Sequence, residues 1–171
     1  MVHYLFETTW VLEAPIQEVF AALTNPDDLL SWWPSVQRAS LVDSGDEKGI
    51  GARASYTVQS PLFYPLHFEL ISTEVEPPRR ISGMARGDLV GTGESNFEED
   101  GDETTIHFRW YVSTAKRWMN LIAPLARPLF AWAHGRVMRQ GFTALARHLD
   151  AREVSVTTSL VDQPTSSLSR D

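Results

Sequence analysis

Residues 129–150 read LFAWAHGRVMRQGFTALARHLD. At the spacing of an α-helix, about 100° per residue, one stripe of this segment is largely apolar. The stripe consists of Phe130, His134, Val137, Met138, Gly141, Leu145 and Leu149. Arg136, Arg139 and Arg147 fall on the opposite side. The pattern predicts a long amphipathic helix with one face available to cover a sheet.

Seven upstream segments have the composition or alternation of β-strands. They are residues 3–13, 36–43, 50–59, 66–76, 80–88, 91–99 and 103–113. In the last of them Ile106, Phe108, Trp110 and Val112 share one face. No helical pattern separates two consecutive strands of the last six, so we expect hairpin connections and an antiparallel sheet.

Two short helices are predicted between the first strand and the rest. Pro15 precedes apolar residues at helical spacing, and Asn25-Pro26 is a typical helix start followed by two acidic residues. The second helix should end at Trp32-Trp33-Pro34, since the residue before a proline avoids the helical region. The predicted fold class is therefore α+β: a curved seven-stranded antiparallel sheet wrapped around the long C-terminal helix. Such an arrangement leaves a cavity between sheet and helix.

Composition narrows the classes of protein further. The chain has 171 residues, 43% of them apolar and none of them cysteine, which fits one domain and excludes disulfides and Cys-ligated metals. Its net charge of -7 argues against a nucleic-acid partner. The start lacks a signal-peptide pattern, so we expect a cytoplasmic protein. We predict one domain over residues 1–151 and a flexible Ser- and Thr-rich tail over 152–171.

Several short motifs resemble one family. They are 14–20 (APIQEVF), 23–26 (LTNP), 32–34 (WWP), 91–94 (GTGE) and 118–120 (WMN). The sequence is similar to the START-like (SRPBCC, helix-grip) superfamily, in its polyketide cyclase/dehydrase-like branch, over about residues 3–150. The resemblance implies a helix-grip fold and a hydrophobic ligand. It assigns no catalytic residue, because its motifs are structural.

His134 and Arg86 are the candidate catalytic residues. A histidine in the apolar stripe could act as an acid or base near neutral pH, and a strand arginine facing the cavity could hold an enolate. The alternatives stay open: His134 as a hydrogen-bonded core residue, and Arg86 as an outer-face residue. The phase of Arg109, between Phe108 and Trp110, favours the outer face.

A set of apolar residues is predicted to line the cavity and bind the ligand. It comprises Tyr56, Phe68, Met84, Phe108, Trp110, Met119, Met138 and Gly141. The alternative is a solid core without a cavity. No cofactor or metal is expected, because the five histidines are scattered and Gly91-x-Gly93 lacks the third glycine of a dinucleotide loop.

Three functions remain open at this level. The first is binding of a small hydrophobic or aromatic ligand such as a lipid, a quinone or a polyketide-like molecule. The second is a polyketide cyclase or dehydratase that uses His134 as acid or base and Arg86 on the enolate. The third is a protein-interaction or peripheral membrane module that uses Trp132, Arg136 and Arg139, unless Trp132 packs on Pro124 or Pro128.

Overall fold

The computed structural model describes the backbone of residues 3–114 and 123–161, and the side chains of 3–113 and 127–161. Its elements follow one another along the chain as β1 (His3–Glu13), α1 (Ile16–Thr24), α2 (Pro26–Trp32), β2 (Val36–Asp43), β3 (Arg53–Gln59), β4 (Pro65–Glu76), β5 (Arg80–Gly87), β6 (Leu89–Asp100), β7 (Glu103–Thr114), α4 (Ala123–His148) and β8 (Arg152–Val161).

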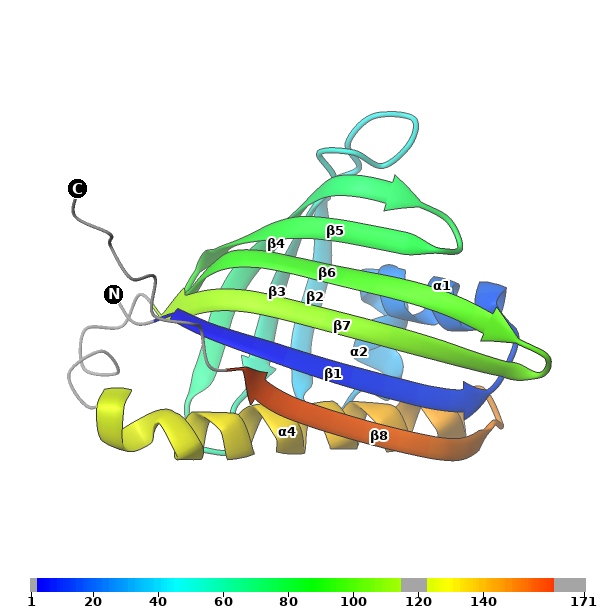
Figure 1. The fold of residues 1–171 in the computed structure, drawn as a ribbon. Helices are drawn as coiled ribbons and strands as arrows, with labels where there is room; N and C mark the ends of the chain where they lie inside the picture. Colours follow the sequence, from blue (N-terminus) through cyan, green and yellow to red (C-terminus); the bar gives the residue numbers. More distant parts are fainter. Residues whose placement is uncertain (1–2, 115–122, 162–171) are drawn as a thin grey trace, which may run out of the picture.

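All strands pair antiparallel in one sheet of the order β2-β3-β4-β5-β6-β7-β1-β8. The sheet curls over α4, which runs along its concave side, while α1 and α2 lie near one end (Figure 1). The predicted α+β class and the long helix gripped by a curved sheet are confirmed.

Alternation along β1 explains how the sheet faces inward. Tyr4, Phe6, Thr8, Trp10 and Leu12 are buried, and Trp10 and Leu12 have no exposed surface. Their neighbours Glu7 and Val11 point to the outer side. Because side chains alternate along a strand, every second side chain of β1 points to the concave side of the sheet, toward α4.

The two short helices form where the sequence predicts them. Asn25 is the N-cap of α2, and its side-chain oxygen accepts a hydrogen bond of 3.0 Å from the Asp27 amide. The helix ends at Trp32, and the Trp33 amide donates to the Leu29 carbonyl. These helices cover one end of the concave face.

The long helix starts earlier than expected. The sequence predicts a start near residue 129, after Pro128, but α4 begins at Ala123 and contains Pro128. Proline lacks the N–H that would donate to the carbonyl four residues back, which costs stability but does not end every helix. Here the helix continues through the proline into the stripe that faces the sheet.

The strand count and the tail prediction also have to be corrected. Residues 152–161, expected to be part of a flexible tail, form an eighth strand that pairs with β1 from Leu5↔Val161 to Glu13↔Arg152. The segment has few large side chains, so its order comes from backbone pairing and from Val156 and Leu160, which pack against the core. Residues 162–171 of that predicted tail lie outside the described residues.

The buried side chains form two clusters. One surrounds Trp10 and includes residues of α1, α2 and the C-terminal half of α4. The other comprises Tyr4, Phe6, Val112 and Phe130. Because Trp10 and Tyr4 lie toward opposite ends of β1, the two clusters sit at opposite ends of the space between sheet and helix.

Candidate functional site: an aromatic cavity under the sheet

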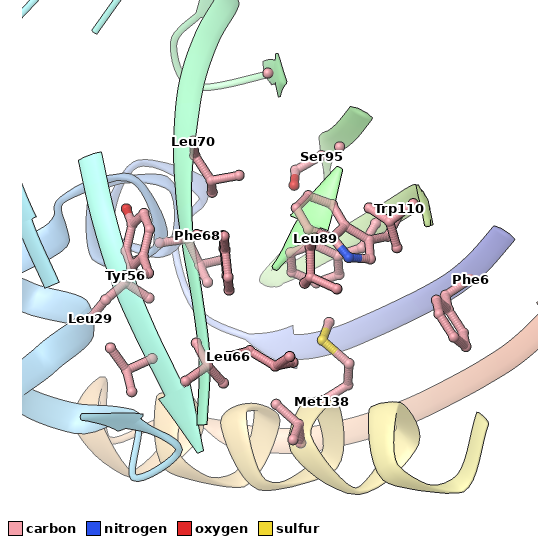
Figure 2. A pocket seen from close by; sticks show the side chains of 18 of the residues that line it. Phe6, Leu29, Tyr56, Leu66, Phe68, Leu70, Leu89, Ser95, Trp110 and Met138 are labelled. Carbon is pink, nitrogen blue, oxygen red and sulfur yellow. The ribbon is translucent and has the colours of Figure 1, made fainter. Parts of the chain in front are cut away.

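A cavity of about 420 Å³ lies between the concave face of the sheet and α4. Its lining comes from strands β1 to β7, the region of α1 and α2, and α4. Figure 2 shows apolar side chains of these elements converging on it. The volume falls within the range of small-molecule sites, and most lining side chains are apolar, as in such sites.

Aromatic rings form the cavity wall on the sheet side. Tyr56 and Phe68 stack with ring centroids 5.9 Å apart, and Phe68 meets Trp110 at 6.4 Å. Phe108 lines the cavity next to Trp10, with centroids 4.7 Å apart in an edge-to-face contact. Their order follows from register, since Tyr56 pairs with Phe68 across β3 and β4. The wall presents ring faces and edges to a planar or aliphatic ligand.

Gly93 gives Trp110 the space it occupies. The two residues are register partners on β6 and β7, and a Cβ atom at Gly93 would overlap with the Trp110 ring. The indole therefore lies over a position without a side chain. A glycine inside a strand is typical of such a close approach.

His134 lies in the cavity wall on α4. Its imidazole stacks on Phe6, with ring centroids 4.1 Å apart and an angle of 18° between the planes. Burial lowers the pKa of His134 from 6.5 to about 4, because the surrounding protein solvates the charged form poorly. The imidazole is therefore neutral at pH 7, with one donor and one acceptor nitrogen.

The other polar groups on the inner side of the wall are uncharged, whereas Glu94 and Arg109, which also border the cavity, form ion pairs with Arg80 and Glu7 on the outer side of the sheet. Burial raises the pKa of Tyr56 to about 12, so its phenol also stays neutral. Ser95 on β6 points into the cavity (Figure 2). The Tyr4 hydroxyl is buried at the Phe130 end and has no hydrogen-bond partner within the described part of the chain. These groups can orient a ligand without adding charge.

Six of the predicted site residues line this cavity. They are Tyr56, Phe68, Phe108, Trp110, His134 and Met138. Met138 extends from α4 toward the aromatic wall (Figure 2). Met119 lies outside the described residues. The binding role of the six remains a prediction, but the fold brings them together from four separate elements.

Arg86 and Met84 do not face the cavity, so their predicted placement has to be corrected. On β5 Ala85 is buried, and Arg86 and Met84, which flank it, are exposed on the other side of the sheet. The inner face of β5 could not be assigned from the sequence, because its inward positions are occupied by small residues such as Gly83 and Ala85. Arg109 also lies on the outer face, where it forms an ion pair of 3.5 Å with Glu7.

Gly141, predicted to contact the ligand, instead contacts a tryptophan. It is buried on α4, and a Cβ atom there would overlap with the indole of Trp33, which itself lines the cavity. Gly141 thus acts on the cavity only through Trp33. Its lack of a side chain lets α4 approach the end of α2.

This packing predicts opposite effects for two glycines of α4. Gly141→Ala should lower the free energy of unfolding by about 1–2 kcal/mol, because overpacking against Trp33 outweighs a gain of about 1 kcal/mol in helix propensity. Gly135→Ala should be neutral or stabilising by up to about 1 kcal/mol, because its nearest neighbour is the Thr158 methyl at 3.9 Å. Urea unfolding measures both. Equal stabilisation by both substitutions would contradict the packing of Trp33 on α4.

Several lining residues were not predicted to line the cavity, although the alternation of side chains along their strands indicates the inner face. Leu66 and Leu70 share the phase of Phe68 on β4, and Phe6 shares that of Trp10 on β1. Extending the period of two along each strand would have found them. Ser95 has no such signal, because only its place between Gly93 and Phe97 indicates the inner face.

The described part of the chain contains neither a metal-binding cluster nor a membrane-spanning helix. Within residues 3–113 and 127–161, no group of three or more His, Asp or Glu side chains is arranged to hold a metal ion. None of the described helices combines the length and the apolarity needed to cross a membrane.

A comparison with models of protein families identifies the family of this chain. The family model described as "Polyketide cyclase / dehydrase and lipid transport" matches residues 4–150. The chain belongs to this family. The match covers β1 through the end of α4 and confirms the expected polyketide cyclase/dehydrase-like branch. A search of curated proteins finds no sequence match.

Solved structures with the same fold include a START superfamily protein and a di-domain ARO/CYC protein. A START superfamily protein from Mycobacterium smegmatis superposes with a TM-score of 0.70 at 13% identity, covering 86% of this chain and 97% of that one. The di-domain ARO/CYC BexL from the BE-7585A biosynthetic pathway gives 0.69 at 18% identity, covering 88% and 51%. A conserved protein from Geobacillus kaustophilus gives 0.64 at 10%, covering 88% and 99%. At these identities the likeness shows the fold.

Proposed function

We propose that this family member binds a small, uncharged hydrophobic ligand, such as a lipid, a quinone or a polyketide-like aromatic molecule, in the cavity under its sheet. The observation that carries the proposal is the cavity of about 420 Å³ with its wall of aromatic rings. A cavity of this volume can hold a small molecule, and its apolar wall would make dispersion contacts with an apolar ligand.

The energetics favour an apolar ligand. Each Å² of apolar surface removed from water contributes roughly 25 cal/mol, so a ligand that fills the cavity gains most of its affinity by burial. His134, Tyr56 and Ser95 supply hydrogen bonds that select an orientation. A ligand of the chemical types in the family description would match this balance of many apolar contacts and few polar ones.

Catalysis by a cyclase or dehydratase mechanism is less well supported. Such a mechanism with His134 as base and Arg86 on the enolate needs both in one cavity, but Arg86 lies on the opposite face of the sheet. An imidazole with a pKa of about 4 is also a weak base at pH 7, whereas an effective general base has a pKa near the working pH. The described geometry therefore supports binding over proton transfer.

The test is a titration with N-phenyl-1-naphthylamine, a neutral fluorescent probe, followed by thermal unfolding with quinones, sterols, phospholipids and aromatic polyketides. We expect saturable fluorescence enhancement that one ligand class reverses. At about 100 times its Kd that class should add about 2.7 kcal/mol to the free energy of unfolding, or roughly 5–10 °C in Tm. If no probe fluorescence develops, the cavity does not take up such molecules and the proposal fails.

A further inference from the structure

The face of α4 that points away from the cavity combines two large apolar side chains with three arginines. It consists of Leu129, Trp132, Arg136, Arg139, Gln140, Thr143 and Arg147, which fall within an arc of about 100° and span about 27 Å of helix. We call it the outer face of α4. Leu129 and Trp132 are 45% and 52% exposed, so both present apolar surface to the solvent on this face. About half of the Trp132 surface is therefore open to a partner.

The charge of this face differs from that of the rest of the protein. Residues 114–149 contain six basic side chains and no acidic one, although the whole chain has a net charge of -7. Within the described part of the chain, Arg136, Arg139 and Arg147 form no ion pair. The Arg136 guanidinium lies 6.0 Å from the centre of the Trp132 ring, so cation and indole form one unit.

We propose that the outer face of α4 docks on an anionic lipid surface. A tryptophan and a leucine flanked by arginines match the interface of a bilayer, where the indole sits at headgroup level and the guanidinium groups meet lipid phosphates. The opposite face of the same helix lines the cavity through His134 and Met138. Docking would therefore bring the ligand cavity within one helix diameter of a membrane.

Vesicle sedimentation tests the docking. We expect the protein to bind vesicles of equimolar phosphatidylcholine and phosphatidylglycerol at about 0.1 M salt, and to be released at roughly 1 M. Arg136→Glu/Arg139→Glu should lower the partition coefficient by about 30-fold or more, since each basic residue near such a surface contributes about fivefold. Lipids with brominated chains should quench the fluorescence of the unsubstituted protein more than that of Trp132→Phe.

The matched control is Arg38→Glu/Arg53→Glu, which makes the same change in charge at exposed positions on β2 and β3. It should bind vesicles within a few-fold of the unsubstituted protein. Equal losses in the two double variants, or no binding to anionic vesicles, would overturn the proposal. Sedimentation velocity provides a further test. If the protein is a dimer and Arg136→Glu/Arg139→Glu dissociates it, a second copy of the chain occupies the outer face of α4 and the proposal is also overturned. The two double variants, Arg136→Glu/Arg139→Glu and Arg38→Glu/Arg53→Glu, should bind N-phenyl-1-naphthylamine with the affinity of the unsubstituted protein. The test of membrane docking is therefore separate from the test of the cavity.

Discussion

Replacing Ser95 with phenylalanine is expected to abolish ligand uptake, with a loss of affinity for N-phenyl-1-naphthylamine of about 100-fold or more. Ser95 lies on the inner side of β6, between its register partners Ile81 and Phe108, and points into the cavity (Figure 2). A phenyl ring at this position would project into the space that a ligand needs. A loss of about 2.7 kcal/mol in the free energy of binding corresponds to a 100-fold increase in Kd.

The folded protein should tolerate this substitution. The new ring enters an existing cavity and meets other aromatic side chains, so we expect the free energy of unfolding to change by less than about 1 kcal/mol. The control is Thr92→Phe, which places the same side chain on the exposed, outer side of the same strand. It should leave probe affinity unchanged. If Ser95→Phe binds the probe as well as Thr92→Phe does, the probe binds elsewhere and the cavity is not the site.

His134 should make the protein less stable in acid by about 2 kcal/mol at pH 5 and about 3 kcal/mol at pH 4, relative to pH 7. Its pKa is about 4 in the folded chain and 6.5 in the unfolded chain, so the unfolded chain binds the proton first as the pH falls. The neutral form keeps its full stability above pH 6.5. The stability is lost progressively as the pH falls from 6.5, and the loss levels off about one pH unit below the folded-state pKa.

Comparing variants isolates this effect from the titration of carboxylates. Urea unfolding of His134→Phe at pH 7 and pH 5 should show about 2 kcal/mol less dependence on pH than the unsubstituted protein. His107→Phe, which changes an exposed histidine on the outer face of β7, should behave like the unsubstituted protein. An unchanged dependence in His134→Phe would mean that the folded protein accommodates the protonated imidazole.

Side-chain periodicity predicted most of the fold because burial is one-sided in these elements. The strands β1 and β7 alternate between large apolar and polar residues, so the amino-acid pattern alone is enough to assign their inner faces. The stripe of α4 was equally clear, and both Phe130 and Leu145 are buried. Where large side chains meet on one face, the sequence and the packing carry the same information.

The errors arose where small residues or long-range pairing decide the structure. On β5 the inward positions are occupied by Gly83 and Ala85, so the larger Met84 and Arg86 indicated the wrong face. β8 looked disordered by composition because its partner β1 lies some 150 residues earlier, as in the contact between Thr8 and Thr158. The local amino-acid pattern of residues 152–161 cannot indicate that a strand so distant in the sequence pairs with them.

The cavity itself could be predicted only in outline. Its existence depends on how far α4 stands from the sheet, which Trp33 and Gly141 help to set. Its neutral character depends on the desolvation of His134 and Tyr56, a property of the assembled wall. The sequence named both residues but not the chemical state that their surroundings impose.

The pairing of β8 with β1 has a consequence for how the chain is made. β1 is synthesised first, yet one of its two edges has no partner until Arg152–Val161 have left the ribosome. Throughout that interval its free N–H and C=O groups form a template for strands of other nascent chains. A truncated protein that stops at residue 150, where the family match ends, would keep this edge open permanently. Truncation at that point should therefore favour aggregation during expression.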